Sequence, residues 1–208
     1  MRIAPKTVGR LSLYRRLLSA MEKQGKLQVY SHQIAAMAGL TPAQVRRDLM
    51  QVKYSGSPTK GYSIPVLKEA IGALLDHPEG QSVALVGVGQ LGRALLNHFA
   101  GRRTDLTIVA AFDNDPDKLT NAIFGGVRIY HIQELKTVIE QNAISIAIIC
   151  VPPEAGQKVV NQLVDAGVTG IVNFVHVPLK VPKNVFMEDM DITMSLEKVA
   201  FYSRQYNS

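Results

Sequence analysis

Glycine residues near the middle of the chain are spaced as in a dinucleotide-binding loop. The loop runs Gly87-Val88-Gly89-Gln90-Leu91-Gly92, directly after an apolar stretch over residues 82–86 and before a helical stretch that ends near Phe99. In this pattern the first glycine permits a tight turn, the second lets a pyrophosphate approach the backbone, and the third allows close packing of helix on strand. We therefore expect all six loop residues to contact a nucleotide whose phosphates face the start of the helix.

An acidic residue at the expected distance completes the motif. The next apolar stretch, residues 107–112, ends in Asp113, which lies 21 residues after Gly92. A carboxylate in this position bonds the hydroxyls of the adenosine ribose. Because it also repels a 2′-phosphate, the sequence favours NAD(H) over NADP(H).

The chain after Asp113 continues to alternate between strand and helix, which predicts a mostly parallel sheet of the Rossmann type. Strands are expected at 127–130, 144–151 and 170–174, and helices at 133–140, 154–166 and 193–206. Ligands bind at the carboxyl ends of parallel strands, so Val151, Pro152 and residues 174–176 are expected to line the nicotinamide end of the site. Cys150 is interpreted as a buried structural thiol inside an apolar strand.

The first fifty residues have the pattern of a helix-turn-helix. A helix is predicted over 7–24, and Ser31 is predicted to cap a second helix over 31–38 that Gly39 ends. Thr41-Pro42-Ala43-Gln44 then offers a capping threonine, a proline for the first helical position and a glutamine for a capping box. Two helices joined by a short glycine turn place the second helix in the major groove of DNA.

The second helix has one apolar and one basic face. Val45, Leu49 and Val52 form its core stripe, and the opposite face carries side chains that can bond base edges, namely Gln44, Arg46, Arg47 and Gln51. Residues 53–62 predict a hairpin tip, the wing of a winged helix, in which Lys53 and Lys60 would contact phosphates. The sequence thus predicts a winged helix-turn-helix.

Charge supports this division of the chain. Residues 1–60 contain eleven lysines and arginines against two acidic residues, a net charge of +9, whereas residues 61–208 carry a net charge of −3. A basic unit joined to a near-neutral one indicates a polyanionic partner for the first unit only. With a helix over 65–75 and a break over 76–81, we expect an α-rich DNA-binding domain at 1–77 and an α/β domain with a C-terminal helix at 78–208.

Several classes of protein are not expected. A single cysteine excludes a disulfide framework, and no pair of histidines has metal-ligand spacing, so we expect no metal. No apolar span approaches 18 residues and no secretory segment is evident, so we expect a cytoplasmic protein. After the nucleotide loop there is no histidine with a neighbouring carboxylate, and there is no separate substrate domain. We therefore assign no catalytic residue and do not expect an enzyme.

With both halves interpreted, the chain resembles the Rex family of redox-sensing transcriptional repressors over nearly its whole length. The matching stretches are residues 10–11, 13–14, 41–49, 87–95, 109–113, 170–174 and 191–192. The recognition-helix run and the glycine loop, at this separation in one chain, form a specific combination.

The resemblance implies a homodimer in which each C-terminal helix is swapped onto the partner. It also implies that NADH, in competition with NAD⁺, closes the dimer and releases it from double-stranded operator DNA. Arg46 and Arg47 would then face bases, Arg16 would lie near both DNA and the domain interface, and Arg10 is taken as a further DNA contact.

Two positions depart from the family pattern. The wing, residues 56–61, lacks the usual Lys-Arg pair, which Lys53 and Lys60 replace only in part. His98 stands where the family has a tyrosine partnered with the aspartate that matches Asp191, so His98 and Asp191 are the candidate switch pair.

Two alternative functions stay open: a small NAD-dependent dehydrogenase with an appended basic domain, and a DNA-binding regulator that senses another nucleotide such as coenzyme A. Asp113 favours a dinucleotide over the latter.

Overall fold

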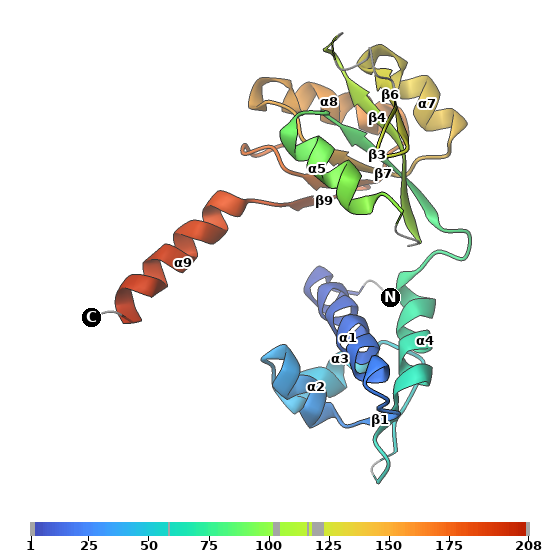
Figure 1. The fold of residues 1–208 in the computed structure, drawn as a ribbon, viewed down its shortest axis with the longest axis vertical. Coiled ribbons are helices and arrows are strands. Elements are labelled where there is room, and N and C mark those ends of the chain that lie inside the picture. Colours follow the sequence, from blue (N-terminus) through green and yellow to red (C-terminus); the bar gives the residue numbers. More distant parts are fainter. Residues whose placement is uncertain (1–2, 58, 102–104, 116, 118–122, 207–208) are drawn as a thin grey trace. The chain divides into compact units, whose positions relative to one another are not determined.

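The computed structural model describes residues 3–57, 59–101, 105–115, 117 and 123–206. The chain divides into two compact units, residues 1–78 and 79–208 (Figure 1). The predicted boundary after residue 77 lies one residue from this division. In the described part of the chain, none of the helices is long and apolar enough to cross a membrane.

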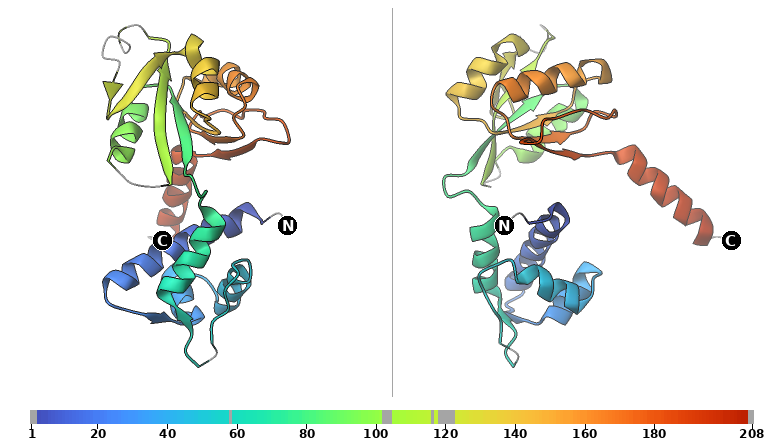
Figure 2. Two further views of the ribbon diagram at one scale, coloured as in Figure 1. Left: turned by 90° about the vertical axis from the view of Figure 1, so that its right-hand side faces the viewer. Right: turned by 180° about the vertical axis from the view of Figure 1, so that it is seen from behind.

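The first unit consists of helices packed against one another and a small two-stranded sheet (Figure 2). Its helices are α1 (Pro5–Lys23), α2 (Ser31–Ala38), α3 (Pro42–Leu49) and α4 (Ile64–Leu75). Strands β1 (Gln28–Val29) and β2 (Tyr62–Ser63) pair in the antiparallel sense. The core consists of fully or almost fully buried side chains from all four helices, including Leu11, Tyr14, Leu18, Ile34, Val45, Leu49, Ile64, Leu67 and Ile71.

Most local predictions for this unit are confirmed. Val45, Leu49 and Val52 are buried, so the basic face of α3 points outward. Thr41 caps α3, since its hydroxyl accepts the Gln44 backbone N–H at 3.2 Å. Ser57 and Gly61 exchange both backbone hydrogen bonds and close the predicted wing, in which Pro58 lies outside the described residues.

Two predicted caps are wrong. The residue that caps α2 is Tyr30, whose backbone N–H donates to the Gln33 side chain at 2.9 Å, and Ser31 is the first helical residue. The Gln44 side chain does not complete a capping box, because its amide donates to Asp48 at 2.9 Å instead. In the first case the helix begins one residue earlier than predicted, and in the second a neighbouring carboxylate four residues away competes for the amide.

The second unit is an open twisted sheet that confirms the expected Rossmann type. Its strands lie in the order β5-β6-β4-β3-β7-β8-β9, and every neighbouring pair is parallel except β5 with β6. These strands are β3 (Gln81–Val86), β4 (Leu106–Asp113), β5 (Ile123–Phe124), β6 (Val127–His131), β7 (Ile146–Ile149), β8 (Gly170–Asn173) and β9 (Phe186–Asp189). The chain order reverses between β3 and β7, which is where such sheets bind ligands.

Helices cover both faces of this sheet. Helix α5 (Gln90–Phe99) lies on one face, where Leu96 packs with Leu85. The short helix η1 (Ile132–Glu134), α7 (Leu135–Gln141) and α8 (Pro153–Asp165) follow β6 and β7. Helices α7 and α8 pack on the face opposite α5, around Phe112 (Figures 1 and 2).

Two strands were not predicted. Strand β5 has only two residues, and β9 has the sequence Phe-Met-Glu-Asp at an exposed sheet edge, so neither shows a clear apolar alternation. Strand β7 is also shorter than expected, and Cys150 therefore follows the strand rather than lying inside it.

The last helix, α9 (Ile192–Tyr206), confirms the predicted C-terminal helix but has no buried residue. Ile192, Leu196 and Val199 fall on one face at helical spacing, and they are 56%, 64% and 66% exposed. A contiguous apolar stripe of this kind marks an association surface.

We therefore expect the protein to be a dimer through α9, and Leu196→Asp to shift it toward monomer at micromolar concentration. Leu196 contributes nothing to the core of its own copy, so the variant should still unfold cooperatively, as a folded monomer. Lys198→Asp places the same carboxylate at an already polar position and should remain dimeric. Light scattering after size exclusion measures both, and equal masses for the two variants would contradict the assignment.

Candidate functional site

The glycine loop has the geometry that each of its glycines predicts. Gly87 has a φ of +98°, and a Cβ there would collide with the carbonyl oxygen of Cys150. A Cβ on Gly92 would collide with the carbonyl oxygen of Gly87, so the start of α5 sits directly against the loop. At Gly89 a Cβ would meet nothing within 4 Å, which leaves the backbone accessible to a ligand.

Asp113 ties this loop to the end of β4. It is 5% exposed, and its Oδ2 accepts the Val88 backbone N–H at 2.7 Å, while Oδ1 accepts the Asp115 N–H at 3.0 Å. The Gly87 N–H donates to the Phe112 carbonyl at 2.8 Å. The carboxylate is thus fixed beside the loop, at the carboxyl end of its strand.

A cavity of about 640 Å³ lies at the carboxyl ends of the central strands. It brings together residues predicted separately from the sequence: Gly87, Gly89, Leu91, Asp113, Val151, Pro152, Phe174 and His176. The other predicted loop residues do not line it, because Val88 and Gly92 are buried and Gln90 is exposed as the first residue of α5. In volume the cavity falls within the range typical of small-molecule and cofactor sites.

One wall of the cavity was missed in the sequence. Helix α8 contributes Ala155, Lys158, Val159 and Gln162, whose spacing puts them on one helix face. That spacing is visible in the sequence, but only the sheet topology shows that this face lies beside the glycine loop. Within the described residues no group of three or more acidic, histidine or cysteine side chains could hold a metal ion.

Cys150 also lines the cavity. Burial raises the pKa of its thiol to about 12, so the thiol is protonated at neutral pH. A protonated thiol is a poor nucleophile. Cys150 is nevertheless half-buried at the cavity wall, so it is not the fully buried thiol inside a strand that the sequence predicted.

In the first unit the predicted DNA contacts fall on α1, α3 and the wing. Arg46 and Arg47 are exposed on α3, Arg16 is exposed on α1, and Lys53 and Lys60 are exposed at the wing. Arg46 also donates to the Ser31 hydroxyl at 3.3 Å.

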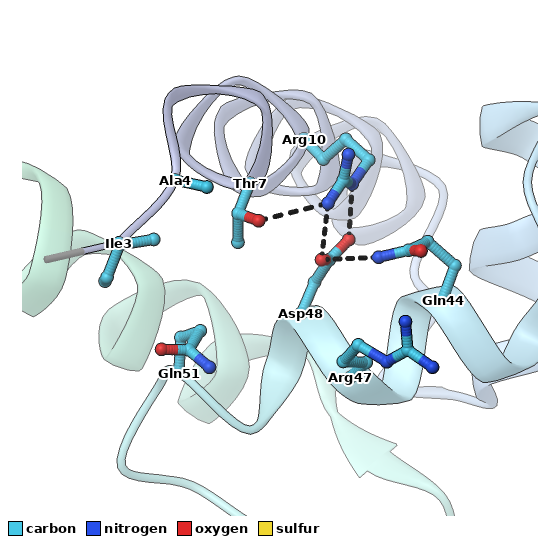
Figure 3. Close-up of a pocket in the computed structure, with 8 residues that line it drawn as sticks. All are labelled: Ile3, Ala4, Thr7, Arg10, Gln44, Arg47, Asp48 and Gln51. Carbon is cyan, nitrogen blue, oxygen red and sulfur yellow. Dashed lines mark hydrogen bonds and ion pairs between the residues drawn. The ribbon is translucent and has the colours of Figure 1, made fainter. Parts of the chain in front are cut away.

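Arg10 has a different environment from these exposed cations. Its Nε and Nη2 donate to the two oxygens of Asp48 at 2.6 and 2.7 Å, and Nη2 also donates to the Thr7 hydroxyl at 3.1 Å (Figure 3). Tyr14 and Gln44 donate to the same carboxylate at 2.8 and 2.9 Å. This cluster borders a hollow of about 450 Å³ that Arg47 and Gln51 also line.

The cluster keeps Asp48 ionised although it is 2% exposed. Burial raises the pKa of Asp48, but the hydrogen bonds from Arg10, Tyr14 and Gln44 lower it by more, so the net shift is downward. The hydrogen bond to Asp48 raises the pKa of Arg10, and burial followed by the same carboxylate raises that of Tyr14.

The proposed switch residues are not in contact within the chain. His98 is exposed on α5 and packs edge-on against Phe99. Asp191 precedes α9, where its Oδ1 accepts the Met194 N–H at 2.7 Å. Among the described residues no hydrogen bond or ion pair joins His98 to Asp191.

Fold and site together define a DNA-binding regulator, with a winged helix-turn-helix unit joined to a Rossmann nucleotide unit. A family model described as "Putative DNA-binding protein N-terminus" matches residues 2–49, and one described as "CoA binding domain" matches residues 79–177.

Curated relatives match nearly the whole chain. The redox-sensing transcriptional repressor Rex of Lactobacillus gasseri is 35% identical over 97% of this chain and 94% of its own length. That of Anoxybacillus flavithermus is 33% identical over 100% of this chain and 97% of its own length. The chain belongs to the Rex family of redox-sensing transcriptional repressors, whose members are regulators rather than enzymes.

Solved structures of a Rex-family repressor match the fold of the whole chain. RSP in complex with β-NAD⁺ and operator DNA matches with a TM-score of 0.90 and 26% identity, over 100% of this chain and 95% of that chain. RSP in complex with β-NADH matches with a TM-score of 0.87 and 26% identity, over 100% of this chain and 97% of that chain. RSP itself is a Rex-family repressor.

We predict that Asp48→Asn lowers the free energy of unfolding of the first unit by about 2–3 kcal/mol at pH 7, because Arg10 loses a buried charged partner. Since the pKa of Asp48 is lower in the folded state than its ordinary 3.8, its contribution is present above that value and is lost as the pH falls through the folded-state pKa. The native protein should therefore lose more stability on acidification than the variant.

Urea unfolding at pH 7 and at about pH 3 measures both effects. Asp76→Asn is the matched control, because Asp76 accepts two hydrogen bonds from Arg15 but is 30% exposed. It should cost less than about 1 kcal/mol. If both variants lost the same free energy of unfolding, the burial of Asp48 would add nothing to the stability that its ion pair provides.

Proposed function

We propose that this protein is a cytoplasmic repressor that binds double-stranded operator DNA as a homodimer and is released by NADH. Support comes from membership of the Rex family and from the RSP structures, which were solved with β-NAD⁺ and operator DNA and with β-NADH. Operator DNA lies in the cytoplasm of bacteria such as those that supply the curated relatives, and the bare apolar face of α9 supports the dimer.

The observation that carries the proposal is one chain with a nucleotide cradle and a basic recognition helix. The loop offers open backbone at Gly89, and Asp113 stands at the end of β4, where a ribose hydroxyl would lie. The residues present therefore fit a dinucleotide. When bound, NADH would supply the redox signal through its reduced nicotinamide ring; the residues of the chain bind and orient it.

The coupling between the two ligands follows from linkage. If the dimer state that binds NADH differs from the state that fits the operator, each ligand lowers the affinity for the other by the same factor. His98 and Asp191 remain our candidates for the pair that distinguishes the two states. Since they are not in contact within one chain, a partner copy or a change of state has to bring them together.

A second candidate ligand is coenzyme A, because the family model for residues 79–177 is described as a CoA binding domain. Coenzyme A carries a phosphate on its ribose, and the buried Asp113 carboxylate would repel that phosphate. We therefore prefer the dinucleotide, and competition between the two ligands separates the proposals directly.

A dehydrogenase would need an acid or base beside the nicotinamide. His176 is the histidine that lines the cavity, and in the described part of the chain it forms no hydrogen bond with a carboxylate. The cavity therefore supports binding rather than turnover, and consumption of NADH with a carbonyl substrate would favour the enzyme instead.

We expect saturating NADH to weaken operator binding by about 5- to 150-fold, the usual range of allosteric coupling. The measurement is a titration of labelled operator, selected from random DNA by this protein, with and without NADH. Operator DNA should weaken NADH binding by the same factor. Equal DNA affinity in the two titrations would refute the switch, even if both ligands bind.

Asp113→Asn is expected to weaken NADH binding and to narrow the preference for NADH over NADPH. The amide keeps the size of the side chain but loses one acceptor and the charge that repels a 2′-phosphate. Asp165→Asn removes the same charge at an exposed site on α8 and should change neither affinity. Calorimetric titration with both cofactors measures the ratio, and an unchanged ratio in Asp113→Asn would contradict the assignment.

A further inference from the structure

All the acceptor positions of the Asp48 carboxylate are in use. Oδ2 accepts from Arg10 Nε and from the Tyr14 hydroxyl, and Oδ1 accepts from Arg10 Nη2 and from Gln44 Nε2. A carboxylate has about four such positions, two on each oxygen. The side chain is 2% exposed, so solvent does not compete with these donors.

This arrangement fixes the orientation of the Gln44 amide. An ionised carboxylate only accepts hydrogen bonds, so the amide nitrogen rather than the oxygen must face Asp48. Figure 3 shows the nitrogen of Gln44 turned toward Asp48 and its oxygen turned away. Arg10 neutralises the carboxylate, which hides its charge from an approaching polyanion.

Gln44 lies on the face of α3 that is expected to enter the major groove. Gln44, Arg47 and Gln51 follow each other at helical spacing and line the same hollow. A glutamine whose amide is unconstrained can pair with adenine through both its nitrogen and its oxygen. When Asp48 holds the amide nitrogen, one of its two N–H groups is used and the oxygen is fixed on the side away from Asp48, where it can only accept.

We propose that Asp48 is a positioning residue that makes Gln44 a hydrogen-bond acceptor toward DNA, so that the base facing Gln44 is one with an exocyclic amino group in the major groove. Adenine N6 and cytosine N4 are such donors, whereas guanine and thymine present acceptors there. This inference rests on the proposed binding of operator DNA. It also gives Arg10 the role of binding Asp48, whereas the sequence analysis expected Arg10 to contact DNA.

The test compares base preference at each position of the operator that the native protein selects from random DNA. The native protein should prefer adenine or cytosine by about five- to tenfold at one position, as for a single hydrogen bond to a base edge. In Gln44→Ala the four bases at that position should bind within about twofold of one another, while preferences elsewhere remain. This variant identifies the position that Gln44 contacts.

Asp48→Asn should relax the same position to within about twofold. An asparagine offers a donor as well as an acceptor, so Gln44 can present either end of its amide. The Arg47→Ala variant identifies the operator positions whose base preference depends on Arg47. Asp48→Asn should leave the preferences at those positions unchanged. Asp76→Asn makes the same charge change in the Arg15 pair of the first unit and should keep every preference.

Three outcomes would overturn the inference: an unchanged preference in Asp48→Asn, an equal loss at all positions, or a Gln44-dependent position that prefers guanine or thymine. An equal loss would mean that Asp48 only stabilises the fold.

A measurement on the native protein covers the case in which Asp48→Asn does not fold. The Gln44 side-chain amide protons in the DNA-free protein should exchange with water more slowly than those of Gln51, and equal rates would also overturn the inference. Failure of the native protein to select any DNA sequence would instead refute the proposed function, and the exchange rates would still report the orientation of Gln44.

Discussion

A buried carboxylate must be hydrogen bonded, and this requirement organises both units of the protein. In the first unit Asp48 joins the recognition helix to α1 through Arg10 and Tyr14. In the second unit Asp113 holds the glycine loop to the end of β4 through the Val88 N–H. Removal of water makes such bonds stronger and makes an unpaired partner costly, so each aspartate fixes two elements relative to one another. The surfaces that meet DNA and nucleotide are both built around these fixed points.

The sequence predicts features whose causes are local. The Thr41 cap, the buried stripe on α3 and the glycine loop each depend on residues within one or two helical turns or one tight turn. The partnership of Arg10 with Asp48 spans 38 residues, and no local pattern announces it. The capping box predicted for Gln44 failed for a different reason: Asp48 lies only four residues away, and two local partners competed for the same amide. The α8 wall of the cavity depends on strand order, and β9 is recognisable only by its neighbour in the sheet.

Family membership and physical structure contribute different kinds of information about this chain. Identities near 35% over almost the full length establish the Rex family, but they do not say which side chains read the operator. The wing lacks the Lys-Arg pair expected from the resemblance, and lysines of a wing contact phosphates rather than base edges. The exposed His98 likewise has to be understood from its own surroundings, because the family's tyrosine is absent.

Helix α9 has a consequence for how the protein matures. It is 15 residues long and buries no side chain in its own copy, and isolated helices of that length are marginal in water. Its order therefore depends on a second copy, so folding of this segment is a bimolecular step. A newly made chain at low abundance would carry a frayed, apolar tail that is open to proteolysis, and the tail would become protected as the protein accumulates. The amount of active repressor would then rise more steeply than the rate of synthesis, which gives the cell a threshold below which little of the protein persists.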